Sequence, residues 1–504
     1  MKLKKRLKGL VAFALAIFCM MQLVASAAGY QSYTYNAYYE PVYSADMYNV
    51  SEVITGNSLG VGSLNQPSDM ITGKDGCVYI TDSKNNRIIK LSAKLEVLKV
   101  YDSFVSGEEK LTLNSPTNVF VTPDGTLYIS DQGNRRVLVS DAEGKVVAKL
   151  EKPKSNLFPQ EKEFLPMDVV VTQTGVIYVL CDGIYQGATI FDEKFEFIGF
   201  YGSNTVEPTL KVIADYFWKK FATKEQRSKM ARYVPVQYSS LTIDDEDFVY
   251  VCVASAKDAS SRVRKLNPLG NNVLVGSDGR KILYGDPMSF TFEGNEYNTV
   301  FESIAVSKNG IFAVLDRTGG KVFVYGQDGD LLTVIGGIGN QKGTFVDAIA
   351  VTFIDNQIAV LDGKKGEITK FSLTEYGNSV LEALEVYTDG RYAESLKLWE
   401  DVLKYNANSY LANLGYGKAL YQIGEYSKAM EYFEIANDKQ RYSYAYKEYR
   451  NQHLRDNYMW YLGGLVMLII LICLCLKFKV FQKIIMRFKL VIRRRKEQKS
   501  HEIQ

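Results

Sequence analysis

The pattern of apolar and polar positions in residues 64–101 predicts four short β-strands. Apolar runs of strand length are separated by turn signals, including an Asp-Gly pair at residues 75–76. Residues 113–150 repeat this pattern, with a second Asp-Gly pair at residues 124–125. A single four-stranded unit of this kind cannot bury both of its faces. The repetition therefore predicts a radial array of such units, which is a β-propeller.

Further copies of the unit bring the predicted number of blades to six. The later copies lie near residues 164–202, 238–275, 300–337 and 344–373. A strand at residues 47–55 has no preceding strands of its own, so we expect it to complete the last blade and remove the open sheet edges. The predicted fold class is mainly β, with a six-bladed propeller over residues 47–375 and a helical insertion at residues 204–237.

Helical periodicity replaces the strand pattern after the propeller. Asp-Gly-Arg-Tyr at residues 389–392 returns as Ile-Gly-Glu-Tyr at residues 423–426, a spacing of about 34 residues that suits paired helices. We expect such helices over residues 379–456. An uncharged apolar run at residues 459–476 is long enough to span a bilayer, and residues 477–504 form a basic tail after it. Apolar residues among the basic ones give this tail two interpretations, contact with anionic lipid or a plain stop-transfer flank.

The two ends of the chain predict the same orientation in a membrane. Residues 1–27 have the basic start, apolar middle and Ala-Ser-Ala ending of a signal peptide, and the Tyr-rich residues 28–46 suggest a linker. The basic tail is expected in the cytoplasm by the positive-inside rule. We therefore predict a single-pass plasma-membrane protein with the propeller outside and the C-terminus in the cytoplasm.

Composition excludes several kinds of chemistry. The net charge of +3 gives no general case for nucleic-acid binding. The two histidines, His453 and His501, both lie outside the propeller, which argues against histidine-held zinc or a Ser/His or Cys/His nucleophile there. Cys77, Cys181 and Cys252 lie in predicted strands and are an odd, scattered set, so we interpret them as buried thiols.

Polar residues at the start of the innermost strands are the candidate site, because these positions line the channel of a propeller. Alignment of the blades gives Asp69, Asn118, Asp168, Ser240 and Ser303, with Ala348 and its neighbour Asp347 in the sixth place. Oxygen ligands converging on an axis could bind Ca²⁺ or Mg²⁺, and Asp69, Asn118 and Asp168 are the candidate metal ligands. The alternative is that these side chains cap the inner strands and bond channel water.

A second set of acidic residues recurs at the end of the following strand in five of the six predicted blades, blade four being the exception. This set comprises Asp82, Asp131, Asp182, Asp316 and Asp362. Because they recur so regularly, we expect them to accept hydrogen bonds from backbone amides in turns rather than to form one site.

The blade motifs resemble NHL repeats. The resemblance rests on the Asp-Gly turns, the Tyr-containing strands that end in Asp, and Asn-Arg pairs at residues 86–87 and 134–135. The helical pair is similar to tetratricopeptide repeats, and the whole arrangement resembles bacterial membrane-anchored NHL proteins. NHL propellers are in general binding platforms for protein or nucleic acid. The related gluconolactonases are enzymes that hold a divalent metal at the propeller axis.

The predicted function is that of an extracytoplasmic binding or scaffold protein held at the membrane. The propeller and the tetratricopeptide-like helices would recognise protein or envelope ligands, with no cofactor and no catalytic residue. The alternative is a metal-dependent, gluconolactonase-like hydrolase, for which Glu302 is the only further acidic candidate in the channel. A third possibility is a sensor that passes ligand state through the single span to the basic tail.

Overall fold

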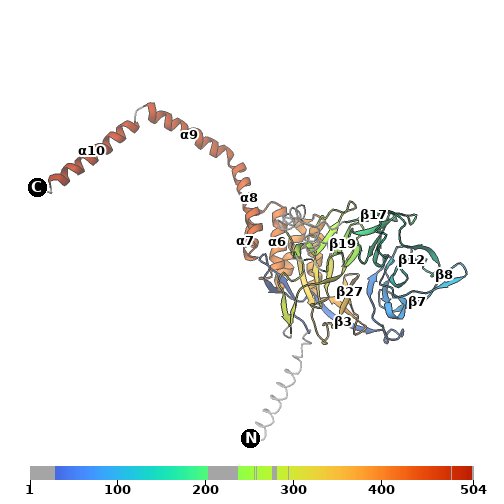
Figure 1. The fold of residues 1–504 in the computed structure, drawn as a ribbon. Helices are drawn as coiled ribbons and strands as arrows, with labels where there is room; N and C mark the ends of the chain where they lie inside the picture. The colour runs from blue at the N-terminus through green and yellow to red at the C-terminus, as the bar shows by residue number, and fades with distance from the viewer. Residues whose placement is uncertain are drawn as a thin grey trace, which may run out of the picture.

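The computed structural model contains a six-bladed β-propeller followed by a helical region (Figure 1). The structure describes residues 29–202, 237–254, 256, 258–274, 281–292, 295–477 and 480–501. Within them the helical region has seven helices, one of which is long and apolar enough to cross a membrane. The expected signal peptide at residues 1–27, and residues 204–236 of the expected insertion, lie outside the described residues.

The strands of each blade run antiparallel and, apart from the outer strand of blade six, follow the chain outward from the channel. Blade one is β4 (Asp69–Thr72), β5 (Val78–Asp82), β6 (Arg87–Leu91) and β7 (Val97–Tyr101). Blade two is β10 (Asn118–Val121), β11 (Leu127–Asp131), β12 (Arg136–Ser140) and β13 (Val146–Leu150). Blade three is β14 (Pro166–Val171), β15 (Ile177–Cys181), β16 (Ala188–Phe191) and β17 (Phe197–Tyr201).

The other blades have the same order. In its described part, blade four has β18 (Ser240–Ile243), β19 (Val249–Cys252) and β20 (Val263–Leu266). Blade five is β23 (Phe301–Val306), β24 (Phe312–Asp316), β25 (Lys321–Tyr325) and β26 (Leu331–Gly336). Blade six is β27 (Ala348–Ile354), β28 (Gln357–Asp362), β29 (Glu367–Leu373) and β3 (Tyr48–Thr55). Two short hairpins, β8 (Phe104–Ser106) with β9 (Glu109–Leu111) and β21 (Phe290–Phe292) with β22 (Asn295–Tyr297), project between blades.

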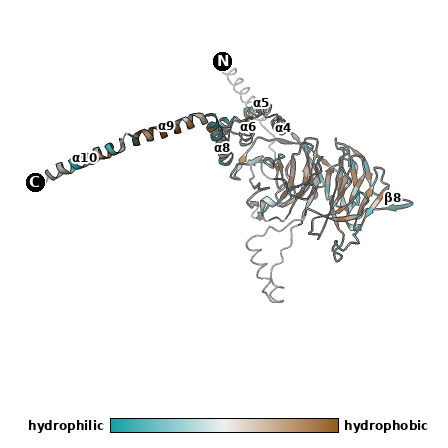
Figure 2. Cartoon of the chain, turned by 90° about the horizontal axis from the view of Figure 1, so that it is seen from above, coloured by the Kyte–Doolittle hydropathy of each residue, from teal (hydrophilic) through white to brown (hydrophobic). Residues whose placement is uncertain are grey.

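The second strand of most blades is buried along its whole length. Every residue of β5, β11 and β24 is buried, because both faces of these strands are covered by the neighbouring blades. Figure 2 shows the same concentration of apolar residues in the propeller strands. Such continuous apolar runs produce the strong strand signal in the sequence.

The N-terminal strand β3 closes the ring, as the sequence predicts. It pairs antiparallel with β29, with Tyr48 opposite Leu373 and Thr55 opposite Glu367. Tyr48 is fully buried, and Ile54 is 6% exposed. The last blade is therefore built from both ends of the propeller sequence, which leaves no open edge at this position.

The prediction that residues 28–46 form a linker is wrong for their described part. They form a hairpin, β1 (Tyr33–Tyr35) with β2 (Pro41–Tyr43), which extends blade five beyond β26. The hydroxyl groups of Tyr33 and Tyr35 each donate to Asp286 over 2.7 Å. The tyrosines are thus packed and hydrogen-bonded side chains that fix the hairpin to the propeller.

The helical region begins directly after the last propeller strand. It comprises α4 (Glu375–Thr388), α5 (Tyr392–Tyr405), α6 (Tyr410–Gln422), α7 (Tyr426–Ile435), α8 (Lys439–Asp456), α9 (Tyr458–Lys477) and α10 (Val480–His501). Thr374 caps α4 by accepting from the Gly377 amide, and its hydroxyl donates to the Asp46 carbonyl. Tyr376 and Val380 of α4 pack in one core with Tyr48 and propeller side chains, so the helices are joined firmly to the ring.

Candidate functional site

A cavity of about 680 Å³ lies where the inner strands of all six blades converge. Asp69, Asn118, Asp168, Ser240 and Ser303 line it, together with apolar residues of the same strands. The turns between first and second strands, such as residues 73–76 and 244–245, surround one end of it. The cavity thus combines apolar strand walls with a small number of polar groups.

Blades one to three are linked in this cavity by their polar side chains. The Asn118 amide nitrogen donates to a carboxylate oxygen of Asp69 over 2.7 Å. The Val169 amide donates to the Asn118 side-chain oxygen at 3.2 Å and to Asp168 at 2.8 Å. Asn118 therefore links Asp69 of blade one to the Val169 amide of blade three, which also donates to Asp168.

The same type of bond links later blades. Ser240 donates its hydroxyl to Asp168 over 3.0 Å, and the Leu241 amide donates to the same oxygen over 2.9 Å. The Val351 amide of blade six donates to the Ser303 hydroxyl of blade five over 3.2 Å. These side chains therefore cap the inner strands in part, which is the second of the two alternatives that the sequence predicts.

Burial makes both carboxyl groups weaker acids by raising their pKa values. Desolvation, reinforced by the charge of Asp168, raises the pKa of Asp69 to about 8, although the hydrogen bond from Asn118 opposes this. Desolvation also raises the pKa of Asp168 to about 6, and the amide of Leu241 limits that rise. Near neutral pH we therefore expect Asp69 to be largely protonated and Asp168 to be largely ionised.

The three candidate metal ligands are engaged in hydrogen bonds in this arrangement. Asn118 turns its amide nitrogen, a donor, toward Asp69, because its oxygen accepts from Val169. Both oxygens of Asp168 accept hydrogen bonds. The described residues also contain no group of three or more His, Cys, Asp or Glu side chains placed to hold a metal ion. A cation here would require Asn118 to reorient and would displace existing bonds.

Asp347, the sixth predicted channel residue, is not among the described residues that line the cavity. It forms a two-point ion pair with Arg317, whose nitrogen atoms lie 2.8 and 3.1 Å from its oxygens, and Arg317 also contacts Glu302 at 3.0 Å. A bulge in β27 places Ala350, not Ala348, opposite Leu361. The same shift occurs in β14 and β23, but the turn from β27 to β28 has two residues where the other blades have five, so the alignment placed the sixth position too early.

The recurring acidic residues are structural, as expected, in four of the five blades where we predicted them. Asp82 accepts from the Asn65 amide, and Asp131, Asp316 and Asp362 accept from equivalent amides before the inner strands. Asp182 is the exception. It is exposed, and β15 ends with Cys181 in the equivalent place.

The Asn and Arg side chains that bond these Asp residues are two positions apart, not adjacent as in the Asn-Arg sequence motif. In blade one, Asn85 and Arg87 bond Asp82, each over 2.8 Å. In blade two, Asn134 and Arg136 bond the equivalent Asp131 over the same distances. The residue between each pair has a positive φ, so the chain turns there and both side chains reach the carboxylate.

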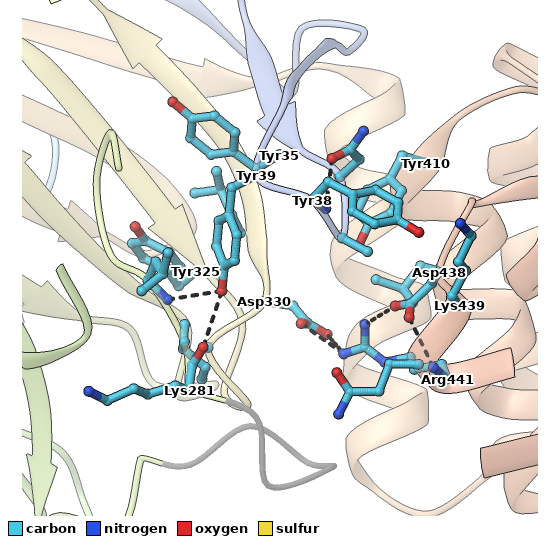
Figure 3. A pocket seen from close by; sticks show the side chains of 18 residues that line it. Tyr35, Tyr38, Tyr39, Lys281, Tyr325, Asp330, Tyr410, Asp438, Lys439 and Arg441 are labelled. Atoms are coloured by element: carbon cyan, nitrogen blue, oxygen red, sulfur yellow. Dashed lines mark hydrogen bonds and ion pairs between the residues drawn. The ribbon is translucent and has the colours of Figure 1, made fainter. Parts of the chain in front are cut away.

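A second cavity of about 480 Å³ lies between the propeller and the helices (Figure 3). Its walls come from the β1–β2 hairpin, including Tyr38 and Tyr39, and from the beginnings of α6 and α8, including Tyr410. The Tyr39 hydroxyl accepts from the Leu283 amide at 3.1 Å. Sequence reasoning missed this cavity, because no motif marks a space between two separate repeats.

Ion pairs beside this cavity fix the helices to blade five. Figure 3 shows Arg441 between Asp330 and Asp438, at 3.1 and 2.7 Å. Lys418 of α6 pairs with Asp330 at 3.1 Å and with Asp328. Burial alone would lower the pKa of Lys418, but the charges of Asp330 and Asp328 outweigh it and raise that pKa. An acidic turn of the propeller therefore occupies part of the face formed by α4, α6 and α8.

The fold and the central cavity define a six-bladed β-propeller with an axial cavity, and several solved structures are similar to it. One is virginiamycin B lyase from Staphylococcus aureus, with 10% identity, a TM-score of 0.40, and coverage of 65% of this chain and 100% of that one. Another is a structural genomics protein of unknown function from Bacteroides thetaiotaomicron, with 12% identity and a TM-score of 0.40, and the match covers 68% and 76% of the two chains. No family model and no curated protein matches the sequence.

Proposed function

We propose that this protein is a membrane-anchored binding protein that takes a ligand in the central cavity of its propeller, outside the cytoplasm. One observation carries the proposal. The cavity of about 680 Å³ has apolar strand walls and a few convergent polar groups, including Asp69 and Asp168. Volumes of about 300–1,000 Å³ with this kind of lining are typical of small-ligand sites.

The chemistry of the cavity supports binding rather than catalysis. A protonated Asp69 can donate one hydrogen bond, and an ionised Asp168 can accept from a ligand that competes with Ser240. Neither histidine nor cysteine is among the described residues that line the cavity. A hydrolase would need an activated water or nucleophile, and the bonds of Asn118 and Asp168 leave no cation-ligand set to supply one.

The other segments support a location at the cell envelope. The NHL-like blades and the tetratricopeptide-like helices suggest binding surfaces, and α9 has the length and composition of a membrane span. Propeller residues occupy part of the face formed by α4, α6 and α8. A protein partner would therefore bind the outer face of α5 and α7 or the open end of the cavity. In this proposal the helices hold the propeller in a fixed position near the membrane.

A plugged cavity tests the ligand site. Thr242 lines the cavity, and Thr242→Trp would fill part of it. Val147→Trp, at a position 59% exposed on outer strand β13, is the matched control. The full chain in detergent would be screened by thermal unfolding against short peptides, oligosaccharides and polyamines. We expect a binding compound to raise the unfolding temperature of the wild type and the control but not of the plugged variant. Equal shifts in all three would contradict the proposal.

Orientation needs a separate test. A C-terminal tag would be followed after protease is added to intact spheroplasts of a bacterial host. We expect the propeller to be digested while a fragment with the tag survives. Survival of the propeller with loss of the tag would show the opposite orientation.

A further inference from the structure

Helix α10, like α9 and unlike α4 to α8, has no packed face among its described residues. It follows α9 and extends away from the propeller (Figure 1). All side chains from residue 482 to residue 495 are exposed. A helix that exposes apolar side chains on every turn is not expected to remain so in water, because burying them is favourable.

Apart from Met486 and Leu490, which lie on the opposite side, the exposed apolar side chains described in α10 form one stripe. They are Ile484, Ile485, Phe488, Val491 and Ile492, and each is more than half exposed. Their spacing of one, three and four residues places them on one side of a helix. Arg495 lies on the same side of the helix one turn after Val491 and Ile492, so the apolar stripe ends before it.

Basic side chains flank and oppose this stripe. In the part with described side chains they are Lys483, Arg487, Lys489, Arg493 and Arg494. This segment contains no acidic residue. An apolar stripe with cations beside it matches a surface that is apolar within and anionic at its boundary.

We infer that α10 lies along the surface of an anionic lipid leaflet, with its apolar stripe in the acyl boundary and its basic side chains among the headgroups. This inference rests on the proposed membrane anchoring, because α9 would bring α10 to the bilayer surface. Long Lys and Arg side chains keep their charges at the headgroups while their stems cover apolar surface. The helix thus acts as a second attachment of the chain, selective for negatively charged lipid.

The test uses trypsin, which cleaves after the basic residues of α10. The full chain with a C-terminal tag is placed in nanodiscs at one copy per disc. One set contains phosphatidylcholine alone, and the other contains phosphatidylcholine mixed with phosphatidylglycerol. We expect tag loss to be slower by at least about tenfold in the anionic discs. Added salt should restore fast cleavage.

Paired variants separate the stripe from simple charge attraction. Ile485→Gln with Phe488→Gln removes two stripe residues, and Met486→Gln with Leu490→Gln removes two apolar residues from the opposite side. The basic residues are unchanged in both. We expect the first pair to lose most of the protection and the second to keep it. Equal cleavage in both lipid mixtures, or equal behaviour of both pairs, would overturn the inference.

Two further outcomes are informative. Protection that appears only with two copies per disc would assign the stripe to a second copy of the chain and overturn the lipid inference. Co-elution of protein with discs is measured separately. Failure to enter the discs contradicts the membrane anchoring itself, whereas entry without lipid-dependent protection contradicts only the role of α10.

Discussion

Replacement of Asp69 by asparagine should stabilise the propeller at alkaline pH. Burial and the nearby charge of Asp168 raise the pKa of Asp69 to about 8, whereas the side chain titrates near 3.8 in the unfolded chain. Between these values the unfolded chain loses the proton while the folded chain keeps it, so stability falls as pH rises. An asparagine at this position would carry no such penalty, and its oxygen can still accept the bond from Asn118.

The size of the effect follows from the pKa difference. Four pH units at about 1.4 kcal/mol each give an upper limit of about 6 kcal/mol above pH 8. Asp69 faces the cavity, where water reduces the cost of its charge, so we expect a gain of about 2–3 kcal/mol at pH 8.5. The gain vanishes only well below pH 3.8, where both the folded and the unfolded chain hold the proton, and at pH 4.5 it should be about 1 kcal/mol.

Thermal unfolding of the full chain at pH 4.5 and pH 8.5 would measure this difference. Asp82→Asn is the matched control, because Asp82 is also buried but accepts from Arg87 and two other groups. That control should lose about 2–4 kcal/mol at both pH values. A fall in stability of the Asp69 variant at pH 8.5, or an equal gain at both pH values, would refute the reasoning.

Three other substitutions or additions have defined outcomes. Lys418→Met removes this partner from Asp328 and Asp330, whose side chains are both only 27% exposed. We expect the free energy of unfolding, measured in urea, to fall by about 2–4 kcal/mol. An unchanged urea midpoint would argue against a stabilising role for these ion pairs. Ile54→Ala, in the closing strand, should cost about 2–4 kcal/mol and increase proteolysis of the propeller. Millimolar Ca²⁺ or Mg²⁺ should leave the unfolding temperature unchanged, and a saturable rise would show that Asn118 does reorient around a cation.

Much of the fold could be predicted because the blades repeat local signals. The run Val78–Asp82 is buried throughout, and its apolar pattern recurs in each blade. The closing strand was also predictable, since residues 47–55 had the outer-strand pattern without a blade of their own. The β1–β2 hairpin was not, because its strands have three residues each and depend on a distant partner, Asp286.

The candidate site was predictable by position but not by geometry. Alignment of the blade sequences with one another identified the polar residues near the start of five inner strands, and these residues line the cavity. It could not show that Asn118 turns its nitrogen toward Asp69, because that depends on how two blades pack. It also misplaced Asp347, because the turn between β27 and β28 is shorter than in the other blades and the alignment did not allow for that difference.

The pairing of β3 with β29 constrains how the chain can fold. Synthesis produces Tyr48 early, but its partner Leu373 is made only after the rest of the propeller. Until then β3 has no partner strand and its free edge could pair with another chain, and the face of blade one that packs against blade six is uncovered. Ring closure should therefore be the last and slowest step of propeller folding, because it joins such distant parts of the chain. A chain interrupted before Glu367 would lack the strand that completes the ring, and we expect cellular quality control to degrade such products.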